Sequence, residues 1–224
     1  QKTNHLLHQS GLISAQSLFY MDMLTKEQLN ILSVFKKDIF TSLTFKQIKQ
    51  GSRQKSNNIV QIALKEFQKQ DIVKTKEIGD VTTYSLNLNN NLTLSYLNLV
   101  NESEISKSKI PKNILDNIQN RIFKNTEFFI LIVFGSYAKN KTTKKSDLDI
   151  AVIVESEHTK KEITPFLETI KRREVIHIDY HIFTRVEFLE MLRTDFENLG
   201  KQIFKSSITY YGYIPYCNLI KAKR

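Results

Sequence analysis

The sequence predicts a mixed α/β (α+β) protein with two successive domains, and three observations support this fold class. First, Thr residues followed three positions later by Gln or Glu recur along the chain, and this capping-box spacing marks helix starts. Second, a pair of β-prone runs follows three helical segments in the first half. Third, the second half places apolar, β-branched runs around a Gly-Ser pair and an Asp-x-Asp motif. The length of 224 residues is sufficient for two small domains.

The composition is that of a soluble globular protein, with 41% hydrophobic and 25% charged residues. The strongest apolar stretch, Phe128 to Phe134, is much shorter than the roughly 18–20 residues that a membrane span needs. The start of the chain has no signal-peptide pattern, and the single cysteine, Cys217, cannot form an internal disulfide. These features argue against transmembrane, extracellular and zinc-ribbon proteins, and they favour a cytoplasmic location.

The formal net charge of +10 indicates a polyanionic partner, either nucleic acid or a nucleoside triphosphate. The alternative is a generally basic surface that only aids solubility. Residues 21–100 and 101–224 both carry an excess of Lys and Arg, so no basic tail accounts for the charge. Residues 1–20 show little pattern, and residues 1–23 are expected to be an N-terminal extension, with Met21 or Met23 as a natural start.

Four capping boxes predict where helices begin. They pair Thr25 with Gln28, Thr44 with Gln47, Thr159 with Glu162, and Thr184 with Glu187. The first helix is expected from about Lys26, with an apolar stripe formed by Leu29, Leu32, Phe35 and Ile39. The second follows Thr44 and ends at Gly51.

A third helix and a hairpin complete the first half. The helix has a face with i, i+3, i+4, i+7 spacing, made of Val60, Ala63, Leu64 and Phe67. Two β-prone runs then extend from Asp71 to Lys76 and from Val81 to Leu86, joined across Gly79-Asp80. Three helices and a hairpin in this order resemble a winged helix-turn-helix domain, here over residues 24–88.

The winged-helix resemblance implies contact with duplex DNA through the third helix and the wing. The candidate contacts are Arg53, Lys55 and Asn57, in the segment expected to start the third helix, together with Lys74 and Lys76 on the wing. Winged helices also serve as protein-interaction modules, and a polar helix face is often simply solvated, so both alternatives remain open.

Residues 89–109 are expected to link the two domains. Tyr96, Leu99 and Val100 suggest one side of a short helix within this linker. Pro111 then suits the first turn of a new helix, because that turn does not need the missing N–H. The second domain is therefore predicted to cover residues 110–224.

The stretch GSYAKNKTTKKSDLDI, positions 135–150, carries the chemistry. Gly135 after an apolar strand permits a tight turn and close approach of the backbone to a ligand. Ser136 at the start of a helix can offer its hydroxyl and nearby N–H groups to phosphate, favoured by the helix dipole. Asp147 and Asp149 are two residues apart on a strand and share one face. Two such carboxylates repel each other and suit divalent cations such as Mg²⁺.

This stretch resembles the signature of the nucleotidyltransferase superfamily, which includes DNA polymerase beta and the minimal nucleotidyltransferases. The resemblance covers about residues 110–215 and implies an α/β nucleotidyltransferase fold with a small mixed sheet. The family commonly has Arg-Gly where this chain has Lys139-Asn140. Lys keeps the charge without the bidentate fork of Arg, and Asn tolerates a left-handed backbone, so Lys139 remains a nucleotide-binding candidate with Gly135 and Ser136.

The superfamily also uses a third acidic residue on a later strand, and the run Val175 to Phe183 supplies Asp179. Alternation places Asp179 with His177 and His181 on one face, and apolar side chains on the other. A His-Asp-His metal site is an alternative interpretation, although histidines in such positions are more often packing residues. A single long helix is expected from Arg185 to Phe204.

The resemblance implies transfer of a nucleoside monophosphate from a nucleoside triphosphate, with ATP expected, to a hydroxyl acceptor. Asp147, Asp149 and Asp179 would be the catalytic residues and would hold two Mg²⁺ ions, and Asp179 could also accept the proton of the hydroxyl. The alternative is a DNA-binding transcriptional regulator or an antitoxin-like protein with a HEPN-type toxin as partner. A homodimer is also left open, and no membrane partner is expected.

Overall fold

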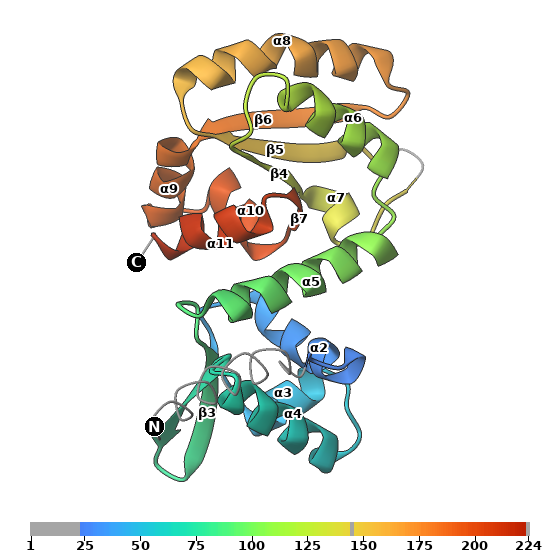
Figure 1. Cartoon of the computed structure of the whole chain (residues 1–224). Helices are drawn as coiled ribbons and strands as arrows, with labels where there is room; N and C mark the ends of the chain where they lie inside the picture. Colours follow the sequence, from blue (N-terminus) through green and yellow to red (C-terminus); the bar gives the residue numbers. More distant parts are fainter. Residues whose placement is uncertain (1–22, 144–145, 223–224) are drawn as a thin grey trace, which may run out of the picture.

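The computed structural model describes residues 23–143 and 146–222. Of the expected extension 1–23, all but Met23 lies outside these described residues. Two α/β parts lie on either side of one long helix, α5 (Figure 1). The mixed α/β fold class predicted from the sequence is therefore confirmed.

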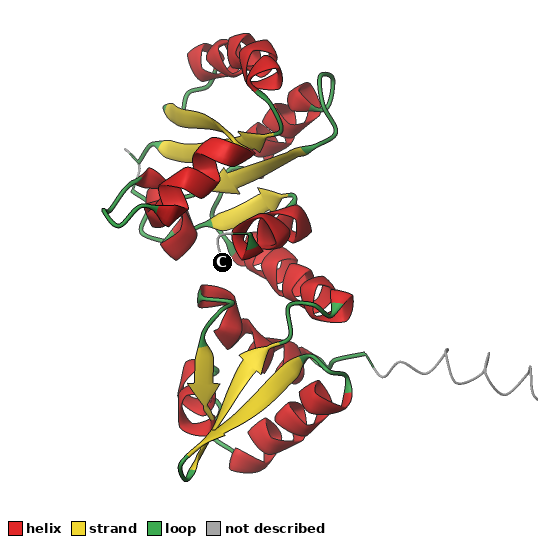
Figure 2. Cartoon of the chain, turned by 90° about the vertical axis from the view of Figure 1, so that its left-hand side faces the viewer, coloured by secondary structure: helices red, strands yellow, loops and turns green. Residues whose placement is uncertain are grey.

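The N-terminal part has short helices on a small antiparallel sheet of strand order β1-β3-β2 (Figure 2). Its elements are α2 (Lys26–Leu32), the 3-10 helix η1 (Ser33–Lys37), β1 (Ser42–Thr44), α3 (Phe45–Gly51), α4 (Asn57–Lys69), β2 (Val73–Ile78) and β3 (Val81–Leu86). This is the element order on which the winged-helix prediction rests, with β1 as an addition.

Local sequence signals explain most of these boundaries. The hydroxyls of Thr25 and Thr44 accept from the backbone N–H groups three residues on, so both predicted capping boxes are present. The face of α4 predicted to be buried is buried along its whole length. The first helix is shorter than its apolar stripe, because it tightens into η1 and Ile39 is buried beyond its end.

Helix α5 (Asn91–Lys107) occupies the expected linker 89–109 and is far longer than the short helix expected there. Seven of its residues are buried, because it contacts both parts of the molecule. Toward the N-terminal part, Glu104 pairs with Lys36. Toward the C-terminal part, the Asn101 side-chain amide donates to the carbonyl of Thr209 at 2.7 Å. The segment predicted as a linker is thus a structural element of both halves.

The C-terminal part is a four-stranded sheet of order β6-β5-β4-β7, with β5 and β6 parallel and the other pairs antiparallel. Its elements are α6 (Lys112–Ile122), β4 (Phe129–Val133), α7 (Gly135–Ala138), β5 (Leu148–Val154), α8 (Glu157–Arg173), β6 (Ile178–Thr184), α9 (Arg185–Arg193), α10 (Leu199–Lys205), β7 (Ile208–Tyr211) and α11 (Tyr213–Lys221). Helices α6 and α8 cover one face, and α9 to α11 cover the other (Figure 1). This is the small mixed sheet expected for a nucleotidyltransferase fold.

Two helix predictions in this part are wrong. Helix α8 starts at Glu157 rather than after Thr159, because Ser156 is the N-cap and accepts from the Thr159 N–H at 3.2 Å. The expected helix from Arg185 to Phe204 is two helices, α9 and α10. Asn198 separates them: its Oδ1 caps α10 while its Nδ2 donates to the carbonyl of Met191 at 2.7 Å.

The sequence analysis did not predict β7 or α11. Strand β7 pairs with β4, and its register shifts at a bulge between Leu131 and Ile132. Among the residues that the structure describes, no helix has the length and apolar character needed to cross a membrane.

Candidate active site

The sheet register brings two of the three predicted carboxylates side by side. In the parallel pair of β5 and β6, Asp149 lies directly opposite Asp179. Asp147 immediately precedes β5, two residues from Asp149. Its neighbour Leu148 and the rest of β5 from Ile150 onward are buried, so Asp149 is the half-buried exception at one end of a buried strand.

Gly135, which follows β4, is packed directly against the Asp149 carboxylate. Its φ is +65°, a left-handed conformation, and a Cβ added there would lie 1.9 Å from Oδ2 of Asp149. The backbone N–H of Phe134 also donates to the Asp149 carbonyl at 3.0 Å, which fixes the turn beside β5. The position therefore requires Gly for both its backbone conformation and its space.

The backbone N–H and the hydroxyl of Ser136 are differently engaged. Its backbone N–H donates to the Asp149 carboxylate. Its hydroxyl oxygen is buried and has no hydrogen-bond partner in the described structure. Helix α7 has only four residues, so the expected helix dipole is small and the free hydroxyl is the main polar group that Ser136 offers to a ligand.

The carboxylates influence one another. The pKa of Asp149 is raised, chiefly by burial and then by the negative charges of Asp179 and Asp147, whereas the Ser136 N–H and His181 oppose this rise. A raised carboxyl pKa in a cluster of like charges is typical of a functional site.

Two histidines flank the carboxylates, and each lies close to a different carboxylate. His177 Nδ1 lies 3.4 Å from Oδ1 of Asp147, and His181 Nε2 lies 3.3 Å from Oδ2 of Asp179. The His181 ring is also parallel to that of Phe183, with centroids 6.1 Å apart. The contact between His177 and Asp147 joins the ends of neighbouring strands, and only the observed parallel register reveals it.

The donor set fits divalent cations and phosphate. Asp147, Asp149 and Asp179 offer the carboxylate oxygens that Mg²⁺ prefers, and the buried Ser136 hydroxyl can donate to phosphate. Within residues 23–143 and 146–222, no three His, Cys, Asp or Glu side chains already converge as a formed metal centre would. The role of Asp147, Asp149 and Asp179 as metal ligands thus stays a prediction, based on the chemistry of their carboxylates.

The third nucleotide-binding candidate, Lys139, is exposed at the end of α7. Among the described residues it forms no ion pair with the three carboxylates. Asn140 has φ +52°, which is a left-handed conformation. Asn tolerates this conformation better than most residues, as the sequence analysis noted.

The nucleic-acid candidates are all exposed in the N-terminal part. Arg53 and Lys55 lie in the turn before α4 rather than on it, because α4 begins at Asn57. Lys74 and Lys76 lie on the same face of β2. The sequence analysis missed the exposed apolar side chains close to these positions, which are Ile59 and Ile62 on α4 and Ile78 and Val81 at the hairpin.

One family model matches part of the chain. Residues 116–213 match the family model described as Polymerase beta, nucleotidyltransferase, and this range includes the Gly-Ser turn and all three carboxylates. No curated protein and no solved structure matches the chain. The family match supports a general nucleotidyltransferase function, which implies a nucleoside triphosphate substrate and typically a divalent metal.

We expect Gly135→Ala to destabilise the protein more than Gly79→Ala does. Both residues have a left-handed φ, so each Ala incurs backbone strain of ~1–2 kcal/mol. Only at position 135 does the new Cβ also collide with Asp149, which adds about 1–3 kcal/mol of overpacking. Urea denaturation of both variants measures the difference. In an Asp149→Ala background the excess cost at position 135 should shrink; an unchanged excess would mean that Asp149 is not the clashing group.

We expect Asp149→Asn to stabilise the metal-free protein at neutral pH. Because its pKa is raised in the folded state, Asp149 favours folding at low pH, and this contribution is lost as the pH rises through the folded-state pKa. The Asn variant avoids the charge repulsion, so its advantage should be largest near neutral pH and should vanish below the ordinary Asp value of 3.8. Thermal melts between these pH values in EDTA test this, with the exposed Asp195→Asn as control. Equal stability of wild type and Asp149→Asn at pH 7 would contradict it.

Proposed function

We propose that this protein is a metal-dependent nucleotidyltransferase that transfers a nucleoside monophosphate from a nucleoside triphosphate, with ATP as the expected donor, to a hydroxyl acceptor. The observation that carries the proposal is the placement of Asp149 between the Gly135-Ser136 turn and Asp179. The geometry supports this function because a phosphate held by the turn would lie beside the carboxylates. The matched family model supports the same general chemistry.

In the proposed reaction, the acceptor oxygen forms a bond to the α-phosphorus, and the bond from that phosphorus to the bridging oxygen breaks. Pyrophosphate leaves with the bridging oxygen. Asp179 takes the proton of the acceptor hydroxyl, and its half-buried position on β6 keeps the carboxylate open to a substrate.

Asp147 and Asp149 would hold two Mg²⁺ ions, and Asp179 would complete the second site. Bound there, the ions supply charge neutralisation for the attacking and leaving oxygens. The chain's own contribution is to hold the three carboxylates at one end of the β5–β6 pair, where burial and then their mutual repulsion raise the pKa of Asp149.

The Gly135-Ser136 turn would bind the triphosphate. The absence of a side chain at Gly135 lets the Asp149 carboxylate approach the turn, and the unpaired Ser136 hydroxyl would donate to a phosphate oxygen. Lys139, exposed at the end of the same turn, would add a positive charge without bidentate geometry.

The N-terminal part would direct the enzyme to duplex DNA. The predicted winged helix over residues 24–88 presents exposed Arg53, Lys55 and Asn57 near the start of α4, and Lys74 and Lys76 on β2. The Asn57 carboxamide already accepts from Lys49 Nζ at 2.6 Å, so its contact with a base edge would exchange one hydrogen bond for another.

We expect Asp149→Asn to abolish nucleotidyl transfer while the protein stays folded. The carboxamide keeps an oxygen that can accept from Ser136 N–H but removes the charge that a cation needs. Incubation with Mg²⁺ and α-³²P-labelled triphosphates measures transfer of label to an added acceptor or to the protein, and the exposed Asp195→Asn is the matched control. Equal transfer by wild type and Asp149→Asn would remove these roles.

We expect the full-length chain to bind duplex DNA with an affinity that falls steeply with salt, with a log–log slope of about −0.9 per phosphate neutralised. Replacing both Lys74 and Lys76 with Ala should flatten the slope and weaken binding to all sequences alike, whereas Asn57→Ala should mainly relax sequence preference. Fluorescence anisotropy with mixed duplexes measures both effects. Exposed Lys109 and Lys124, both outside the N-terminal part, are replaced together as the control. Absence of binding at low salt would favour a protein-docking role instead.

A further inference from the structure

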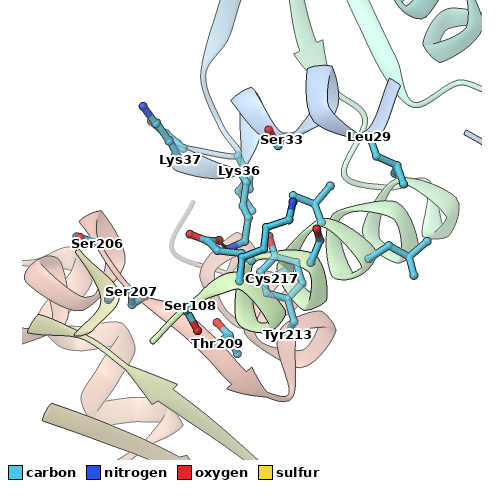
Figure 3. Close-up of a pocket in the computed structure, with 18 of the residues that line it drawn as sticks. Leu29, Ser33, Lys36, Lys37, Ser108, Ser206, Ser207, Thr209, Tyr213 and Cys217 are labelled. Carbon is cyan, nitrogen blue, oxygen red and sulfur yellow. Dashed lines mark hydrogen bonds and ion pairs between the residues drawn. The ribbon is translucent and has the colours of Figure 1, made fainter. Parts of the chain in front are cut away.

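A cavity of about 890 Å³ lies between the N-terminal part and the C-terminal part, outside the carboxylate site (Figure 3). One wall is α2 with η1, the base is α5, and the other wall comes from α10, β7 and α11, with Ala138 and Asn140 on either side of Lys139 also in the lining. We call it the interdomain cavity. Its volume is within the range of about 300–1,000 Å³ typical of small-molecule sites.

The interdomain cavity is lined by positive charge. Five lysines line it against three acidic residues; the lysines are Lys26, Lys36, Lys37, Lys107 and Lys205. Lys36 has a side chain only 12% exposed, pairs with Glu104 and lies 5.6 Å from the centroid of the Tyr213 ring. Figure 3 shows Lys36 directed from η1 toward Tyr213. Lys205 pairs with Glu197 at 2.8 Å, so the charge that favours an anion comes from Lys26, Lys37 and Lys107, which are exposed at the cavity.

Hydroxyl groups line the same cavity. Ser206 and Ser207 precede β7, whereas the hydroxyls of Ser33 in η1 and Ser108 after α5 already donate to backbone carbonyls, at 2.6 Å and 2.8 Å. The Tyr216 hydroxyl is buried and makes no hydrogen bond of normal geometry in the described structure, with the Ser207 hydroxyl as its polar neighbour. Hydroxyl donors beside lysines are the groups that bind phosphate oxygens.

The cavity also has an apolar portion. Leu99 of α5 is 43% exposed even though it is a large apolar side chain, and it lines the cavity with Leu29 and the Tyr213 ring. An aromatic ring and aliphatic side chains offer a flat, desolvated surface on which a nucleobase can stack or pack. Charge and hydroxyls for phosphate, with an apolar surface for a base, together define the ligand chemistry.

We propose that the interdomain cavity is a second ligand site, which binds a nucleoside phosphate between the two halves of the molecule. Inorganic phosphate would use only the lysine and hydroxyl groups, and a nucleoside only the apolar ones, so a nucleotide binds more tightly than either. The site differs from the carboxylate site in one testable way: its ligand meets positive charge, so binding needs no divalent cation.

The test is isothermal titration calorimetry of the full chain in EDTA, with ADP, adenosine and inorganic phosphate titrated separately. ADP should bind with one-to-one stoichiometry and more tightly than the other two. Charge reversals on two separate elements, Lys37→Glu on η1 and Lys107→Glu on α5, should each weaken ADP binding by about tenfold or more. Both residues are exposed, so the variants are expected to fold, which circular dichroism checks.

Two controls separate this site from general charge and from the proposed active site. Lys161→Glu makes the same charge change on the exposed surface of α8, and Ser136→Ala alters the carboxylate site; neither should change ADP affinity in EDTA. Absence of ADP binding in EDTA, equal weakening by Lys161→Glu and Lys37→Glu, or loss of binding in Ser136→Ala would overturn the proposal. Phosphate binding as tight as that of ADP would refute the nucleoside part of the site.

Discussion

The parallel pairing of β5 with β6 is the constraint on which the candidate site depends. Asp149 and Asp179 face each other because the buried side chains of β5 fix the register of the two strands. A slip of one residue would transfer every side chain of a strand to the opposite face, so the apolar core prevents it. The packing of the sheet therefore determines the distance between the two carboxylates, even though neither carboxylate belongs to the core.

The same arrangement places three carboxylates close together at one end of β5, where their repulsion does not stabilise the fold. Burial and the neighbouring carboxylates raise the pKa of Asp149, and the Ser136 N–H and His181 compensate only in part. Gly135 contributes by having no side chain, since any Cβ would displace the carboxylate. The clustered carboxylates lower stability locally, and the surrounding sheet must offset this cost. Such residues are typically retained for chemistry.

Much of the site follows from sequence because its determinants are local. The Gly-Ser turn, the two-residue spacing of Asp147 and Asp149, and the alternation around Asp179 are all short-range patterns. The features that were missed depend on tertiary structure. Asn198 interrupts a segment with helical character by bonding to both neighbouring helices, and the contact of His177 with Asp147 exists only because two strands pair in parallel. Capping signals were ambiguous where Ser156 and Thr159 both had suitable side chains, and Ser156 is the N-cap.

Helix α5 has a consequence for how the molecule holds together. One continuous apolar cluster includes Phe35 of the N-terminal part, Tyr96 and Leu97 of α5, and Tyr216 of α11. Neither half can separate from this helix without exposing apolar surface to water. The boundary that the sequence predicts between two domains is therefore bridged by shared apolar packing, and residues of both halves would lose buried contacts if α5 were displaced.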